Sequence, residues 1–259
     1  MFEGKVGAAL KFLDENAENA VLQPTAEVIA KLRTLHPEQS EISPGTLLHG
    51  PLEEVSSGYF NNITEQNIQK LARQTKGAGG TSMMDSRQWK RLLCSSHFKT
   101  ESKDLREELA KFARKIATET VDPATLEAYN ICRLIPLDKK PGSPELQIRP
   151  IGVGEVVRRI VGKTIVWSLS TEIEEAAGPL QVSSGLKGGA EAAIQNLKTK
   201  IEEEASDAII LVDAENNAFN RLNRLAALHN MQYICPTFAQ VLINTYRTPA
   251  RPIIVGGGK

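Results

Sequence analysis

Cysteine, histidine and long apolar segments are all scarce in this chain of 259 residues. The three cysteines are widely spaced and odd in number, which argues against a disulfide framework. The four histidines are equally scattered, so no zinc-ligand spacing appears. No apolar run approaches the ~20 residues that a membrane span needs, and residues 1–5 lack the apolar core of a signal peptide. We therefore expect an intracellular protein with no membrane partner, and the sequence does not distinguish nucleus from cytoplasm.

The net charge is zero, but the charges are segregated along the chain. Residues 1–65 carry 4 Lys and Arg against 10 Asp and Glu, whereas residues 66–164 carry 19 against 11. Residues 165–259 carry 8 against 10. A basic middle block indicates a phosphate-rich partner held by one region. Solvated helix faces would produce the same excess, so both interpretations stay open.

The spacing of apolar residues predicts a largely helical chain of one large or two small domains. Helices are expected after Thr25, over residues 68–72 and 85–93, after Ser102, over 155–175, after Gly188, near residue 221 and from Pro236.

A β-hairpin is predicted over residues 132–137 and 147–151, which are two extended segments separated by a turn. Lys139, Lys140 and Arg149 would lie near the tip of this hairpin. Lysine supplies a point charge and arginine a planar fork that matches phosphate oxygens, so the tip could hold a small polyanion. A last strand is expected near the C-terminal end of the sequence.

Three glycine-containing segments invite a nucleotide-binding interpretation. The glycines of residues 76–80 allow close backbone approach, or form a plain flexible turn. Residues 162–164 resemble the end of a P-loop, but Val157 stands where that motif needs its first glycine. Residues 152–154 begin like a dinucleotide fingerprint, whose third glycine would also fall on Val157. Both motifs are therefore rejected.

A short run of apolar, partly β-branched residues over 208–212 ends in Asp213. The run predicts a buried strand with a carboxylate at its exit, a common place for a metal ligand or a catalytic acid. The alternative is that Asp213 caps the helix expected near residue 221.

Several segments, in this order, resemble the start of a retrotransposon-type reverse transcriptase domain: residues 76–89, 134–140 with 149–153, 181–193, and 211–213 with 218–220. The resemblance covers roughly residues 66 to 259, and its specificity lies in the ordered set. It implies an α+β fold with right-hand polymerase fingers and an incomplete palm, preceded by a helical N-terminal extension. The implied parts are residues 1–65 (extension), 66–205 (fingers-like) and 206–259 (first part of the palm).

The resemblance also implies roles for individual residues. Asp213 resembles the catalytic, metal-binding aspartate of the palm. Lys139 or Lys140, together with Arg149, resembles the cations that hold the triphosphate of an incoming dNTP. Phe219 resembles the aromatic residue that packs under the sugar and excludes a ribose 2′-hydroxyl. The implied cofactor is Mg²⁺, as two ions about 3.5–4 Å apart, and the implied partners are an RNA or DNA template–primer and dNTP.

The sequence departs from the family pattern at the expected metal site. Four residues, rather than three, separate Asp213 from Ala218, so either a local bulge absorbs the extra residue or Ala214 takes the catalytic position. The family's Gly-Gln loop and its hairpin with paired aspartates would follow residues 253–255, where this sequence stops. No Asp-Asp pair occurs anywhere in the chain.

We therefore expect a fragment of a reverse transcriptase with little or no polymerase activity alone, because Mg²⁺ needs several oxygen ligands. An alternative is a non-catalytic nucleic-acid-binding remnant that uses the basic residues 66–164. A third is a degenerate fragment without a function.

Overall fold

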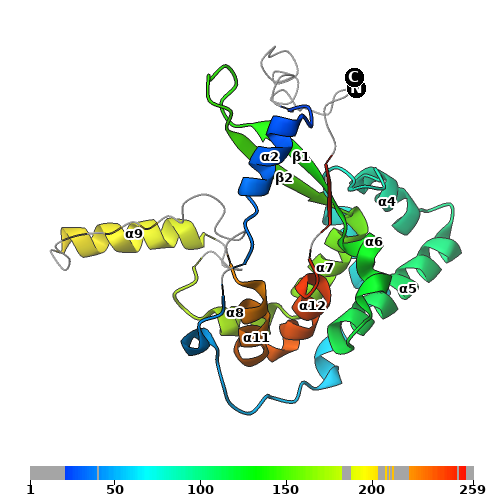
Figure 1. Ribbon diagram of the computed structural model, residues 1–259. Helices are drawn as coiled ribbons and strands as arrows, with labels where there is room; N and C mark the ends of the chain where they lie inside the picture. Colours follow the sequence, from blue (N-terminus) through cyan, green and yellow to red (C-terminus); the bar gives the residue numbers. More distant parts are fainter. Residues whose placement is uncertain are drawn as a thin grey trace.

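The computed structural model describes residues 21–39, 41–182, 188–203, 208, 210, 212, 222–249 and 251–254. They form a mixed α and β structure, in agreement with the predicted α+β class, with most helices below a small sheet in Figure 1. The strands are β1 (Cys132–Asp138), β2 (Ile148–Gly154) and β3 (Pro252–Ile254). The helices are α2 (Ala26–Thr34), α3 (Glu65–Gln74), α4 (Ser86–Leu93), α5 (Lys99–Thr118), α6 (Glu127–Asn130), α7 (Val156–Ser168), α8 (Ser170–Ala177), α9 (Gly189–Glu202), α11 (Arg224–Ile234) and α12 (Pro236–Tyr246), with 3₁₀ turns at Pro44–Thr46, Ser57–Phe60 and Pro123–Leu126.

The sheet has the strand order β2-β1-β3. The first two strands form an antiparallel hairpin, in register from Cys132 opposite Gly154 to Asp138 opposite Ile148. The third strand lies parallel to β1 on its other edge, with Pro252 opposite Cys132. Both the predicted hairpin and the predicted last strand are therefore confirmed.

Helix α2 covers the sheet, as Figure 1 shows. The Thr25 side chain caps the helix by accepting a hydrogen bond from the Val28 amide at 3.3 Å, which confirms the predicted start. Val28 and Leu32, one helical turn apart, are buried against Leu134 of β1 and Ile148 of β2.

The main hydrophobic core joins the 3₁₀ turn Ser57–Phe60 to α5, α7 and α12. Its buried members are Phe60, Ile63, Ala113, Ile116, Ala117, Leu126, Val161, Ile165, Leu169 and Val241. A smaller core joins α3, α4, α5 and α7 through Ile68, Ala72, Leu93, Ala110, Val156 and Ile160. Residues on both sides of the predicted boundary at residue 65 share the main core, and α12 brings it a residue from beyond 205.

Two helix predictions are wrong in detail. Ser102 does not cap a helix: α5 begins at Lys99, and the buried Ser102 hydroxyl donates to the Leu92 carbonyl at 2.7 Å, which ties α5 to α4. The single helix expected over residues 155–175 is two helices. Leu169, at φ −111° and ψ 22°, leaves the helical conformation while its side chain stays fully buried, so α7 ends before it and α8 begins after it.

The prediction of a buried strand before Asp213 is wrong at the positions that the structure describes. Ile210 and Val212 are 86% and 90% exposed, and neither is in a strand.

Helix α9 forms as predicted but does not bury its apolar side chains. Figure 1 shows it extending away from the other helices. Its residues Ile194, Leu197 and Ile201 are 56%, 42% and 51% exposed. In α11, likewise, Leu228 is buried, whereas Leu225 and the preceding Leu222 are exposed.

Candidate functional site

The structure brings the three predicted phosphate-binding cations together at one end of the β1–β2 hairpin. Lys139 and Lys140 directly follow β1, and Arg149 stands in β2 opposite Leu137, one pair from the end of the ladder. All three residues are exposed. This part of the predicted site is therefore formed by a local element, the hairpin itself.

One backbone and one side-chain hydrogen bond hold the turn that carries these cations. The Lys139 amide donates to the Gln147 carbonyl at 2.7 Å, and the Lys140 amide donates to the Asp138 carboxylate at 2.9 Å. Within the described residues, no hydrogen bond or ion pair engages the side chains of the three cations. The acidic residues of the hairpin end are Asp138, whose carboxylate binds the turn, and Glu145. Among the described residues, therefore, no acidic side chain neutralises the three cationic head groups.

The catalytic half of the predicted site cannot be placed beside the hairpin. Asp213 and Phe219 lie outside the described residues, as do residues 183–187 of the third resembling segment. The assignment of Mg²⁺ to Asp213, and the choice between a bulge and Ala214 in the catalytic position, therefore stay predictions.

A second feature is the glycine loop, residues 76–84, which is fastened at the opposite end of the hairpin from the cations. Arg159 of α7 donates a hydrogen bond to the Ala78 carbonyl, and Arg133 of β1 donates to the Gly79 carbonyl at 3.1 Å. The plain flexible turn that the sequence also allowed is therefore not what forms. The loop is a fixed connection between α3 and α4.

Glu155, directly before α7, is the anchor of the glycine loop. Its buried carboxylate accepts hydrogen bonds from the Thr81 hydroxyl at 2.9 Å, the Ser82 amide at 2.8 Å and the Ser82 hydroxyl at 2.6 Å. A β-carbon on Gly80 would lie 2.6 Å from the Glu155 Oε1 atom, so only glycine fits this approach.

The surroundings of Glu155 stabilise its negative charge. Burial raises the pKa of its carboxyl, but the hydrogen bonds from Ser82 and Thr81 outweigh burial and hold the pKa below its ordinary value. The position at the N-terminus of α7 also favours a negative charge. Sequence reasoning singled out the glycines and missed Glu155, although an acidic residue just before a helix is a usable signal. Nothing in the sequence indicates that Arg133 and Arg159 bind carbonyl groups of the same loop.

We expect Glu155→Gln to destabilise the protein most near neutral pH. Because the folded-state pKa of Glu155 lies below the unfolded-state value, its stabilisation is present above the unfolded pKa and is lost as pH falls through the folded pKa. Urea unfolding of wild type and variant should therefore differ at pH 7 and converge between about pH 5 and pH 3. Glu174→Gln, at an exposed position on α8, is the control and should follow wild type throughout. A difference for Glu155→Gln that does not change with pH would contradict this account.

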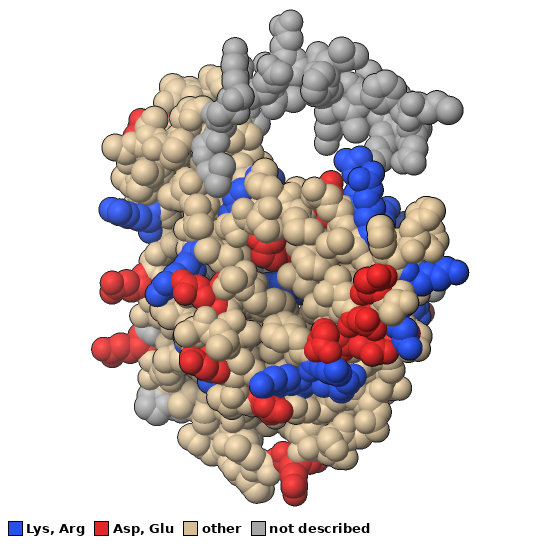
Figure 2. Space-filling view, turned by 90° about the vertical axis from the view of Figure 1, so that its right-hand side faces the viewer, with Lys and Arg blue, Asp and Glu red and all other residues tan. Residues whose placement is uncertain are grey.

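On the face that Figure 2 shows, basic side chains do not form a continuous surface. Figure 2 shows the face at the right of Figure 1, where Lys and Arg side chains are interspersed with Asp and Glu. On α5 three of the four lysines form ion pairs with neighbouring acids: Lys103 with Glu107, Lys111 with Glu108, and Lys115 with Glu119. The interpretation of solvated helix faces therefore holds for part of α5, whereas the cations of the hairpin end have no such pairs among the described residues.

Comparisons with protein-family models, with curated proteins and with solved structures find no match to this chain. Over the ranges that the structure describes, no helix combines the length and apolar character needed to cross a membrane.

Proposed function

We propose that this chain binds nucleic acid through the cationic end of the β1–β2 hairpin, as part of a fingers-like region related to reverse transcriptases. The observation that carries the proposal is the hairpin, which places Lys139, Lys140 and Arg149 at the same exposed end. The ordered resemblance to reverse transcriptase segments supports the same partner. Of the activities that the resemblance implies, binding is the one for which described residues supply the contacts.

The chemistry of these cations suits phosphate oxygens. An arginine fork and two lysine head groups, not engaged by acids among the described residues, can each neutralise one phosphate and release its counterions. The same contacts would serve the triphosphate of a dNTP or the backbone of a template–primer. Polymerase chemistry at Asp213 with Mg²⁺ belongs to the proposal only through the resemblance, and the expectation of little or no activity alone stays a prediction.

The triple variant Lys139→Ala/Lys140→Ala/Arg149→Ala should bind a short single-stranded oligonucleotide at least about tenfold more weakly than wild type. Each lost phosphate contact also lowers the salt dependence, so the slope of log K against log salt should fall by about 2–3 between roughly 50 and 200 mM salt. Fluorescence anisotropy with a labelled oligonucleotide measures both quantities.

The matched control is Lys163→Ala/Lys198→Ala/Lys200→Ala, which removes the same charge from exposed positions on α7 and α9. It should keep an affinity close to that of wild type. An equal loss of affinity in both variants would mean that net charge, and not the hairpin, attracts the nucleic acid. Binding that is absent, or insensitive to salt, in the wild type would overturn the proposal.

A further inference from the structure

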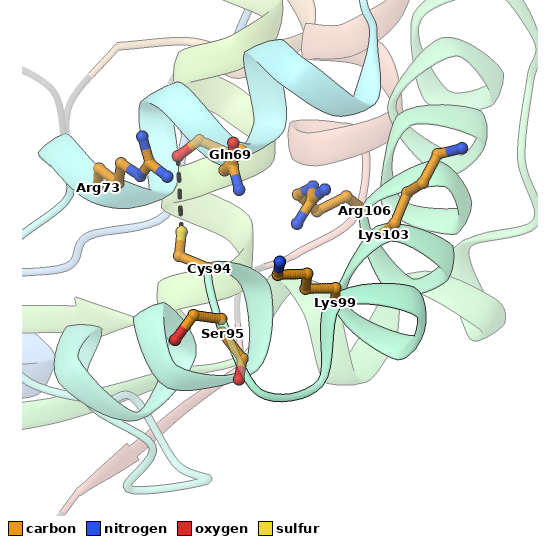
Figure 3. A pocket seen from close by; sticks show the side chains of 8 residues that line it. Gln69, Arg73, Cys94, Ser95, Lys99, Lys103 and Arg106 are labelled. Atoms are coloured by element: carbon orange, nitrogen blue, oxygen red, sulfur yellow. Dashed lines mark hydrogen bonds between the residues drawn. The ribbon is translucent and has the colours of Figure 1, made fainter.

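A cavity of about 410 Å³ lies where three helices meet, away from the hairpin. It is bounded by α3, by the C-terminal end of α4 and by the first turns of α5, as Figure 3 shows. Its wall combines four basic side chains with small polar ones and includes no acidic residue. The residues that line it are Gln69, Arg73, Cys94, Ser95, Ser96, Lys99, Lys103 and Arg106.

The four basic residues of this cavity differ in whether their side chains already form ion pairs or hydrogen bonds with other residues. Arg106 is buried, and it donates to the Glu65 carboxylate at 2.6 Å and to the Leu93 carbonyl at 2.7 Å. Lys103 forms an ion pair with a glutamate on its own helix, and in Figure 3 it points away from the others. Arg73 and Lys99, by contrast, have no ion pair among the described residues. Two positive charges from two different helices are therefore left facing the cavity.

The wall of the cavity is held in place by contacts between the helices. Arg106 links the end of α4 to the start of α3, and the Ser102 hydroxyl adds a bond from α5 to α4. The Cys94 thiol lies 3.8 Å from the Gln69 carbonyl of α3 and donates to it, the dashed line in Figure 3. The Ser95 hydroxyl accepts hydrogen bonds from two backbone amides of the turn before α5. The helices and the turn that surround the cavity are thus held together by contacts within the chain.

We propose that this cavity binds a phosphoryl group, with Arg73 and Lys99 as the charge contacts and Arg106 as the residue that positions the wall. An arginine and a lysine on opposite sides suit a doubly charged or bridging phosphate, because one supplies a bidentate fork and the other a point charge. The volume lies within the range of small-ligand pockets, about 300–1,000 Å³, so a nucleotide-sized group fits. The phosphoryl group comes either from a free nucleotide or from a nucleic-acid backbone, which share this chemistry.

Cys94 makes the proposal measurable, because a ligand in the cavity covers its partly exposed thiol. The full chain is treated with iodoacetamide, and mass spectrometry follows alkylation at Cys94 and at Cys132, which is also partly exposed but lies outside the cavity. The probes are pyrophosphate, a nucleoside triphosphate and a short oligonucleotide, each compared with sodium chloride at the same ionic strength. A probe at about four times its dissociation constant should slow alkylation of Cys94 about fivefold, while Cys132 is unchanged.

The variant Arg73→Ala/Lys99→Ala should lose this protection, and Lys198→Ala/Lys200→Ala should keep it. Protection by pyrophosphate and the triphosphate would assign the cavity to free nucleotides, whereas protection by the oligonucleotide alone would assign it to a nucleic-acid backbone. Equal protection in the Arg73→Ala/Lys99→Ala variant, or no protection by any probe, would overturn the proposal. The hairpin triple variant should still be protected by pyrophosphate if pyrophosphate protects wild type, so the two proposals fail separately.

Discussion

The substitution Ile165→Ala is expected to lower the free energy of unfolding by about 2–5 kcal/mol, the usual range for truncating a buried isoleucine. Ile165 of α7 is fully buried in the main core, where helices α5, α7 and α12 and the 3₁₀ turn Ser57–Phe60 meet. Removing its outer carbons leaves a cavity whose walls belong to several elements. Those elements are distant in sequence, so the cavity cannot close by moving one side chain. Urea unfolding followed by circular dichroism measures the loss.

The next residue in the same helix is the control for that measurement. Val166 is 42% exposed, so Val166→Ala should change the free energy of unfolding by no more than about 0.5 kcal/mol. If Ile165→Ala prevents folding, Ile165→Val should still show a loss of about 0.5–1.5 kcal/mol. Equal effects at the two neighbouring positions would mean that α7 does not face the core as described.

The substitution Gly80→Ala should cost about 2–3 kcal/mol, which is large for a single added methyl group. Its β-carbon would lie 2.6 Å from the Glu155 Oε1 atom and 2.9 Å from the Glu155 amide nitrogen. The second contact is to backbone, so a side-chain rotation does not relieve it. Moving the glycine loop outward would instead break the hydrogen bonds that Thr81 and Ser82 donate to Glu155. Thermal or urea unfolding reports the change.

Gly162→Ala is a control with the opposite sign. Gly162 lies inside α7, and a β-carbon there meets nothing within 4 Å. Alanine should therefore stabilise the helix by about 0.5–1 kcal/mol through its higher helix propensity. Gly80→Ala at wild-type stability would show that the glycine loop does not press against Glu155. The helical position of Gly162 also agrees with the rejection of a P-loop at residues 162–164.

The sequence correctly predicted elements that are stabilised by residues close together in the chain. Thr25 marks the start of α2 because its hydroxyl satisfies a free amide of the first helical turn. The extended segments around Lys139 and Lys140 pair because they are adjacent in sequence, and adjacency alone brought Arg149 to the same end of the sheet. This part of the candidate site could be predicted, since a hairpin positions its own side chains.

Patterns failed where burial depended on a neighbour from elsewhere in the chain. The apolar residues of α9 have helical spacing, yet Ile194 is exposed. Helical spacing puts apolar residues on one face of a helix, but it does not provide another element for that face to pack against. Ile210 and Val212 have strand-forming character, yet both are exposed and neither is in a strand, because β-branched character does not by itself supply a neighbouring strand to pair with. Ser102 has the chemistry of a cap, and its hydroxyl bonds instead to the end of a different helix.

By itself, the sequence determined the α+β class, the hairpin and the row of cations at its end, since each of these follows from residues close together in the chain. The tertiary structure alone decided that Glu155 would anchor the glycine loop and that Arg73 and Lys99 would face one cavity. These residues come from separate helices and loops, and only the packing of those elements sets the distances between them. The sequence specifies which side chains are charged or can form hydrogen bonds, whereas the fold decides which of these side chains come into contact.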